Sequence, residues 1–138
     1  MFLKKLLSIT LLVLAASLAG CAVTSQQLRA DPNETGSFHV DVPFEEVRAN
    51  LISVFKSCYK LNIGAGYSYP EIYDTIPNQA VTVEGVLDGK SRQVLISVDA
   101  TKNPNGGTDI TYDKGRLAIF VNYKKTVENW ANGKDKGC

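Results

Sequence analysis

The sequence predicts a single α+β domain, in which an antiparallel sheet of element order β-α-β-β-β-α packs two amphipathic helices on one face. Two observations predict the helices: apolar residues recur at three- and four-residue spacing over residues 43–60 and again over 116–131. A third predicts the sheet, because Asp88-Gly89 separates two runs rich in β-branched residues, which is a strong hairpin signal. A meander of strands needs its apolar face covered, and the two helices are available to cover it.

The first predicted elements are a strand over residues 37–42 and the helix over 43–60. Apolar and polar residues alternate in the strand, which places Phe38 on the core face and the single histidine, His39, on the outer face. Pro43 suits the first turn of a helix, and the two glutamates that follow it closely complement the helix dipole. We expect the histidine to be a half-exposed strand residue, since the sequence offers it no partner of catalytic type.

The stretch 61–78 contains two glycines and two prolines and is predicted to be a long irregular loop. Long loops are uncommon inside compact domains, so the stretch is either functional or hides a short strand. Its three tyrosines suit recognition because they combine a large contact area with a polar group; alternatively, two of the three fold over the sheet edge as additional core. The candidate partner-binding residues are Tyr67, Tyr69, Glu71, Tyr73 and Asp74.

Three more strands and a closing helix complete the predicted domain. The strands cover residues 80–87, 92–100 and 108–112, and glycine-containing turns separate them. The closing helix over 116–131 carries Trp130 on its apolar stripe, so we expect this side chain in the core.

Residues 1–20 have the pattern of a secretory signal. Two lysines precede a short apolar run, and Leu18-Ala19-Gly20-Cys21 follows it. This segment resembles the lipobox of bacterial lipoproteins. The resemblance implies cleavage after Gly20 and a lipid anchor on Cys21. Because Ala22 rather than an aspartate follows, it also implies the outer membrane, with the domain facing the periplasm or exposed at the cell surface.

Residues 21–36 would then comprise the lipidated cysteine and a polar tether. The tether shows no periodicity, so we expect a flexible linker with a mean reach of roughly 20 Å, followed by the folded domain over 37–138. With Cys21 taken up by the lipid, Cys58 and Cys138 remain. An even pair of cysteines in an oxidising envelope compartment predicts one disulfide.

The sequence contains no catalytic or cofactor motif that we recognise. It has no Gly-x-Ser-x-Gly elbow, no glycine-rich phosphate loop and no His-Glu-x-x-His, and one histidine does not supply a usual zinc site. Lys and Arg total 15 against 14 Asp and Glu, which argues against a nucleic-acid partner. The basic residues of 114–138 form either a solvated helix face or a contact with anionic lipid headgroups. We expect no enzyme activity, metal or cofactor.

Three functions stay open at this point. The leading one is a small recognition or accessory module, anchored to the outer membrane, for an envelope protein partner. The second is a cleft between helices and sheet that binds a small apolar molecule or lipid. The third is inhibition of a wall-lytic enzyme, although small lipoproteins of that kind are all-β barrels. The element order resembles the helix-grip domains of accessory lipoproteins in outer-membrane assembly, such as the BamC domains, in architecture only.

Overall fold

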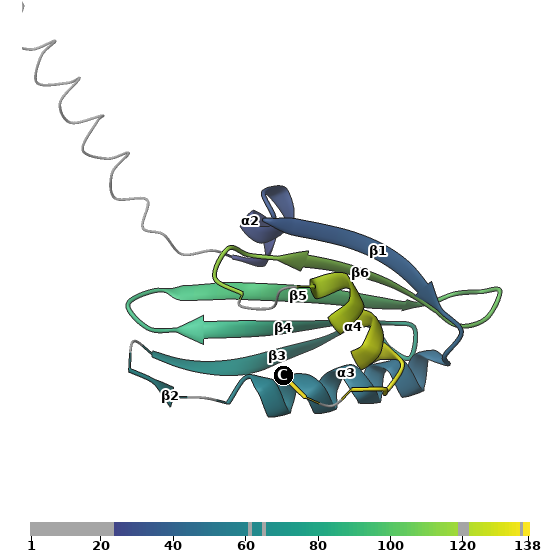
Figure 1. Cartoon of the computed structure of the whole chain (residues 1–138). Coiled ribbons are helices and arrows are strands. Elements are labelled where there is room, and N and C mark those ends of the chain that lie inside the picture. The colour runs from purple at the N-terminus through teal and green to yellow at the C-terminus, as the bar shows by residue number, and fades with distance from the viewer. Residues whose placement is uncertain (1–23, 61, 65, 119–121, 136) are drawn as a thin grey trace, which may run out of the picture.

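The computed structural model describes residues 24–60, 62–64, 66–118, 122–135 and 137–138 (Figure 1). The signal segment and the lipobox lie outside these residues. No helix within them is long and apolar enough to cross a membrane. In chain order the elements are α2 (Ser25–Ala30), β1 (Glu34–Val40), α3 (Phe44–Cys58), β2 (Asn62–Ile63), β3 (Gly66–Ile76), β4 (Ala80–Asp88), β5 (Arg92–Lys102), β6 (Thr108–Lys114) and α4 (Tyr123–Ala131).

The strands form one antiparallel sheet in the order β1-β6-β5-β4-β3-β2. Consecutive strands from β2 to β6 are neighbours, and β1 pairs with β6, so the first and last strands lie side by side (Figure 1). Asp88 pairs with Arg92 across the β4–β5 turn, where the Asp-Gly dipeptide predicts a hairpin. The α+β class and the antiparallel sheet are confirmed.

Helices α3 and α4 cover one face of the sheet, as the sequence predicts, and enclose the main core there. The apolar stripe of α3 is buried because residues three and four apart share one side of a helix. Phe55 of α3 meets Trp130 of α4 edge to face, with ring centroids 5.7 Å apart, and both side chains are fully buried. Tyr59 packs over Gly85 of β4, where any added Cβ would lie 2.3 Å from its ring.

The predicted disulfide between Cys58 and Cys138 is present and joins residues 80 positions apart. It connects the end of α3 to the last residue of the chain. Beside it, the Trp130 indole donates a hydrogen bond of 3.0 Å to the Gly137 carbonyl. The chain end is therefore held against the two core helices.

The irregular loop predicted over 61–78 is wrong for most of this stretch, and the alternative of a strand hidden in it is confirmed, although the strand is longer than expected. β2 and the 11-residue β3 occupy it, and β3 pairs with β4 along most of its length. Proline can occur in a strand only where its missing N–H is not needed, typically at an edge. Pro70 meets this condition because β2 pairs only with Gly66 and Tyr67, which leaves the outer side of β3 beyond them without a strand partner among the described residues.

The prediction of a flexible tether up to residue 36 is also wrong for its described part. Residues 25–30 form the helix α2, which lies on the sheet face opposite α3 and α4, and β1 begins at Glu34. Thr24 and Gln27 form a capping box, and Leu28 is only 1% exposed. A six-residue helix is too short to show periodicity, and such a helix depends on tertiary packing for its stability.

Two boundaries also differ from prediction. The first strand runs over Glu34–Val40 instead of 37–42. The closing helix covers Tyr123–Ala131, and residues 116–118 precede it in non-helical conformation, while 119–121 lie outside the described residues. Periodicity identifies the middle of an element better than its ends, because caps and neighbouring strands decide the ends.

Candidate functional site

The sheet face opposite α3 and α4 carries four of the five predicted recognition residues. Successive side chains of a strand point to opposite faces. Ile72 of β3 packs against the main core, whereas Tyr69 packs against Leu28 of α2 together with Val86 and Val94. The odd-numbered residues of β3 therefore lie on the α2 side. We call this set the tyrosine face; it consists of Tyr67, Tyr69, Glu71 and Tyr73.

Ring stacking and hydrogen bonds fix the side chains of the tyrosine face. The rings of Tyr67 and Tyr69 stack with centroids 5.4 Å apart and planes 28° apart. Glu71 accepts hydrogen bonds from the Tyr73 hydroxyl and from the guanidinium of Arg92 on β5. Partial burial acts to raise the pKa of Glu71, but these two donors outweigh it and hold the pKa below its usual value. The hydrogen bond to Glu71, with partial burial, raises the pKa of Tyr73 to about 12.

The tyrosines of this face differ in their exposure to solvent. Tyr67 is 54% exposed and Tyr73 45% exposed, whereas Tyr69 is partly buried under α2. Tyr69 is therefore additional core, whereas Tyr67 and Tyr73 are exposed to solvent. At the end of the same strand, Ile76 is 49% exposed. These side chains line a strand whose outer edge is unpaired beyond Tyr67 among the described residues.

A polar network lies beside the tyrosine face, beneath α2, and the sequence analysis does not identify it. Glu84 of β4 is only 1% exposed and accepts hydrogen bonds from Ser25 of α2 (2.8 Å) and Ser97 of β5 (3.2 Å). Arg29 of α2 donates to Ser97 (3.2 Å) and to Asp99 of β5 (3.1 Å). The alternation of polar and apolar residues in β4 and β5 is the signal that could have revealed this face.

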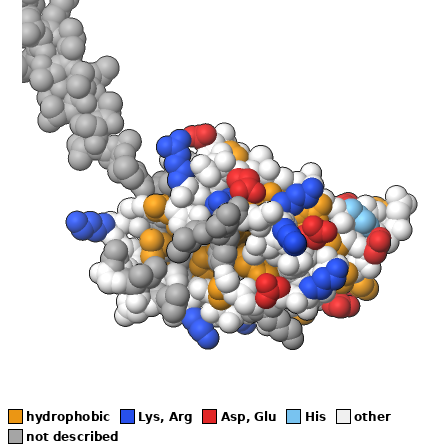
Figure 2. All heavy atoms as spheres, in the orientation of Figure 1, with side chains coloured by type: hydrophobic (Ala, Val, Ile, Leu, Met, Phe, Trp, Pro, Cys, Tyr) orange, Lys and Arg blue, Asp and Glu red, His pale blue; other side chains and the backbone are white. Residues whose placement is uncertain are grey.

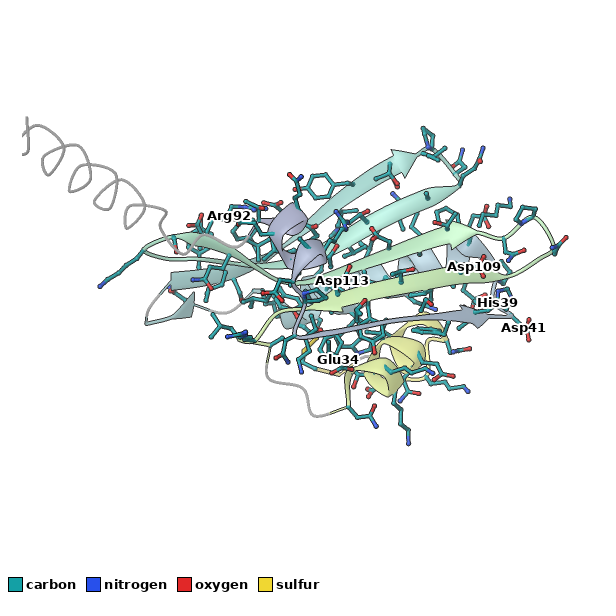
Figure 3. The ribbon with its side chains drawn as sticks, turned by 90° about the horizontal axis from the view of Figure 1, so that it is seen from above. Glu34, His39, Asp41, Arg92, Asp109 and Asp113 are labelled. Carbon is teal, nitrogen blue, oxygen red and sulfur yellow. A yellow bond between two sulfur atoms is a disulfide. The ribbon has the colours of Figure 1, made fainter. Side chains whose placement is uncertain are left out.

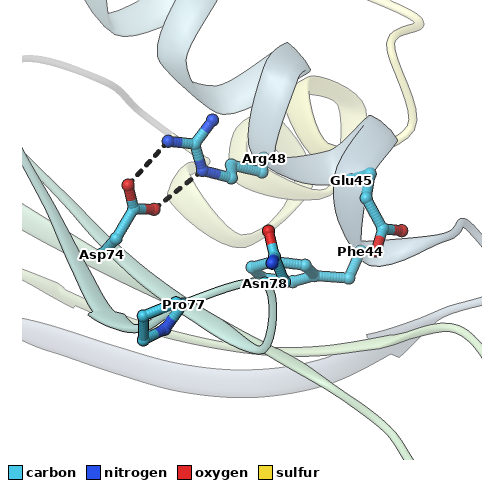
Figure 4. Close-up of a pocket in the computed structure, with 6 residues that line it drawn as sticks. All are labelled: Phe44, Glu45, Arg48, Asp74, Pro77 and Asn78. Carbon is cyan, nitrogen blue, oxygen red and sulfur yellow. Dashed lines mark hydrogen bonds and ion pairs between the residues drawn. The ribbon is translucent and has the colours of Figure 1, made fainter.

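The fifth predicted residue, Asp74, lies on the other side of β3 and faces α3. Its carboxylate accepts two hydrogen bonds of 2.8 Å from Arg48 of α3 (Figure 4). The hydrogen bonds from Arg48 lower the pKa of Asp74. The ion pair borders a cleft of about 370 Å³ whose other lining residues are Phe44, Glu45, Pro77 and Asn78. A charged pair at the wall gives this cleft a polar character.

His39 lies at the end of β1, between two carboxylates (Figure 3). Its Nδ1 is 2.8 Å from Asp109 on β6, and its Nε2 is 3.3 Å from Asp41. The hydrogen bond with Asp109, followed by the contact with Asp41, raises the pKa of His39. Asp109 also accepts a hydrogen bond of 2.7 Å from Asn103 of the β5–β6 turn. As predicted, the histidine is a half-exposed strand residue; the cluster ties β1 to this turn.

Among the described residues, no group of three or more His, Cys, Asp or Glu side chains is arranged to hold a metal ion. No protein-family model matches the sequence, and no curated protein matches it significantly. The functional argument therefore depends on the site itself.

Proposed function

We propose that this protein is a lipoprotein of the bacterial outer membrane that recognises a protein partner in the envelope through its tyrosine face. The lipid anchor would be attached to Cys21, as the lipobox resemblance implies. The domain would act without catalysis, as a small rigid module that presents β3 to the partner.

The observation that carries the proposal is the preorganised arrangement of exposed tyrosines on the edge strand. Tyrosine is enriched at protein interfaces because its ring buries a large area and its hydroxyl still finds a partner. Tyr67 and Tyr73 are about half exposed, and each is held by a neighbour, namely the Tyr69 ring and the Glu71 carboxylate. Side chains that are already ordered lose less conformational entropy on binding.

The outer edge of β3, which no strand of the described residues covers beyond Tyr67, supports the same surface in a second way. An extended segment of a partner could add to this edge by main-chain hydrogen bonds, with the tyrosines alongside as specificity contacts. Pro70 removes one donor from the strand, which limits unspecific pairing between edges. A partner segment would therefore have to match the position of this proline.

A ligand-binding cleft is the second function considered, and its support is weaker. Helices α3 and α4 pack directly on the sheet, and side chains between them, such as Val47, Leu51 and Trp130, are fully buried. The cleft at the N-terminal end of α3 is bordered by the Arg48–Asp74 ion pair instead of an apolar wall. No observation favours a role as an inhibitor of a wall-lytic enzyme.

Photo-crosslinking in cells tests the proposed function. A photo-reactive phenylalanine analogue replaces Tyr73, which is exposed, in preference to Tyr69, which packs under α2. The matched control carries the same analogue at Thr111, an exposed position on the same sheet face but on β6. We expect one abundant protein adduct from position 73 and none from position 111. Adducts to lipid alone, or equal adducts from both positions, would contradict recognition by the tyrosine face.

A further inference from the structure

We propose that the domain stands upright on the bilayer, with one end of its sheet held against the lipid headgroups. The inference rests on the lipid anchor proposed above and adds the surface that faces the membrane. That surface, which we call the anchor end, comprises the β4–β5 turn and the segment after β6, beside α2. Its exposed residues include Lys90, Arg116 and Leu117, and Asp88 of the turn is partly exposed.

The docking of α2 leaves almost no tether between the anchor and the folded domain. Leu28 is buried against Val86 and Val94, and hydrogen bonds from Ser25 and Arg29 fasten α2 to the sheet. Three peptide links join Cys21 to Thr24. Because consecutive Cα atoms are about 3.8 Å apart, the two Cα atoms lie within about 11 Å of each other in any conformation. A lipid on Cys21 therefore keeps the start of α2 close to the headgroups.

The strand register places the anchor end beside α2. Ser25 reaches Glu84, which pairs with Ser97 in the middle of β5, and Leu28 lies nearer the β4–β5 turn, against Val86 and Val94. The Gly115 amide donates to the Leu95 carbonyl (2.8 Å), and a Cβ at Gly115 would lie 3.5 Å from Leu28. Figure 1 shows the β4–β5 turn at the same end of the sheet, at the left, and the β5–β6 turn at the opposite end. β5 has 11 residues, so the two ends are roughly 35 Å apart at about 3.3 Å per residue.

The two ends also differ in charge. Lys90 and Arg116 are exposed at the anchor end and outnumber the partly exposed Asp88 there, and Leu117 is 59% exposed. The opposite end carries Asp41 and Asp109 around His39, and its exposed Lys102 is paired with Glu45; Figure 2 shows acidic side chains flanking the histidine there, at the right. Basic and apolar side chains suit an anionic lipid surface, whereas carboxylates are repelled by it.

Charge also distinguishes an upright domain from one that lies flat on the sheet face that carries α2, which we call the polar face. That face presents Glu71, Asp99 and Asp109 outside the short helix α2, with Arg29 and Arg92 engaged in ion pairs with two of these acids. A flat orientation would bring these carboxylates against the headgroups. An upright orientation keeps them, and the exposed Tyr73, accessible to a protein partner.

Fluorescence quenching by lipids tests the orientation. The full lipidated protein is reconstituted into vesicles of phosphatidylethanolamine with a minor fraction of phosphatidylglycerol, which also contain a lipid with a nitroxide on its headgroup. A fluorophore is attached to a non-natural ketone residue at Lys90, Thr111 or Asn105, which leaves the Cys58–Cys138 disulfide intact. We expect quenching to be several-fold stronger at position 90 than at 105, with 111 between them. Equal quenching at positions 90 and 111 would show that the domain lies flat on the bilayer. Equal quenching at all three positions would show that it moves freely. Either result would overturn the inference.

An insertion supplies the matched control. About ten Gly and Ser residues between Val23 and Thr24 leave the described fold intact but add roughly 17 Å of mean reach. The difference between positions 90 and 105 should then largely disappear. If the insertion leaves the difference unchanged, the short connection does not orient the domain and the inference fails.

Charge reversal separates the contribution of the surface from that of the connection. Arg116→Glu should reduce quenching at position 90, and Lys102→Glu at the opposite end should not. An equal effect of the two changes would contradict a basic contact surface. A failure of the lipid anchor gives a different result from a failure of the orientation. Without a lipid on Cys21, the protein would not enter the vesicles. In cells, Cys21→Ser would then leave the distribution of the protein between membrane and soluble fractions unchanged.

Discussion

The two faces of the sheet are formed by the same strands, yet they are covered in different ways. On one face, the 15-residue α3 and the 9-residue α4 bury an apolar layer that includes Val83, Ile96 and Val98. On the other, the 6-residue α2 buries a single leucine and is otherwise held by hydrogen bonds to Glu84, Ser97 and Asp99. Apolar burial on the first face therefore contributes most of the folding free energy, whereas the second face has side chains available for contact.

The largest effect is expected from a core substitution on the apolar face. Phe55→Ala removes a fully buried ring that contacts Trp130 and Tyr59. The free energy of unfolding should fall by about 3–5 kcal/mol, because the cavity adds to the lost burial. Urea denaturation measures this change. A loss below about 1 kcal/mol would contradict the assignment of stability to this face.

Removal of the disulfide should have the next largest effect. Cys58→Ser with Cys138→Ser opens a loop of 80 residues and should cost about 2–4 kcal/mol, since the unfolded chain gains conformational freedom. Comparing urea denaturation of the native protein with and without reductant gives an independent value. If the reductant lowers the free energy of unfolding of the native protein but not of the double variant, the loss of stability is due to the Cys58–Cys138 disulfide.

Leu28→Ala tests how independently α2 is attached. The substitution should cost about 2 kcal/mol or less in global unfolding, because α2 can detach while the main core stays intact. Hydrogen exchange should show faster exchange of the α2 amides and unchanged exchange in α3. Faster exchange throughout the domain would instead mean that the two faces unfold together.

The stability contributed by the His39–Asp109 pair should depend on pH. The pKa of His39 is raised in the folded state above the ordinary 6.5, first by the hydrogen bond with Asp109. This interaction therefore stabilises the fold fully below the unfolded pKa, and the contribution is lost as pH rises through the folded pKa. NMR titration should find a raised pKa that returns toward 6.5 in Asp109→Asn, and less so in Asp41→Asn. An unchanged pKa in Asp109→Asn would exclude the pair.

The smallest effect on stability is expected at the tyrosine face. Tyr73→Ala removes an exposed ring, so the free energy of unfolding should change by no more than about 0.5 kcal/mol. Capture of the envelope partner by the purified domain should nevertheless fall several-fold, and Thr111→Ala should leave it unchanged. A large loss of stability in Tyr73→Ala would make this residue part of the fold instead of the contact surface.

The errors of prediction concern segments with weak local signals. Pro70 and the glycines of 61–78 indicate a loop when only neighbours in sequence are considered, but the pairing of β3 with β4 outweighs them at a sheet edge. The helix α2 has one buried residue and therefore no apolar period. For the candidate site, the sequence identifies the tyrosines and Glu71, while Arg92 and Glu84 come from strands whose register only the folded chain defines.

Local sequence signals suffice to predict the amphipathic α3, the Asp-Gly hairpin and the disulfide between the two remaining cysteines. Periodicity and turn chemistry are local properties, so they can be recognised without a fold. The tertiary structure alone decided that β3 is a strand, that its tyrosines share a face with α2, and that Asp74 faces Arg48 instead. These outcomes depend on strand register and on burial between distant segments, and both arise only when the sheet and its helices are assembled.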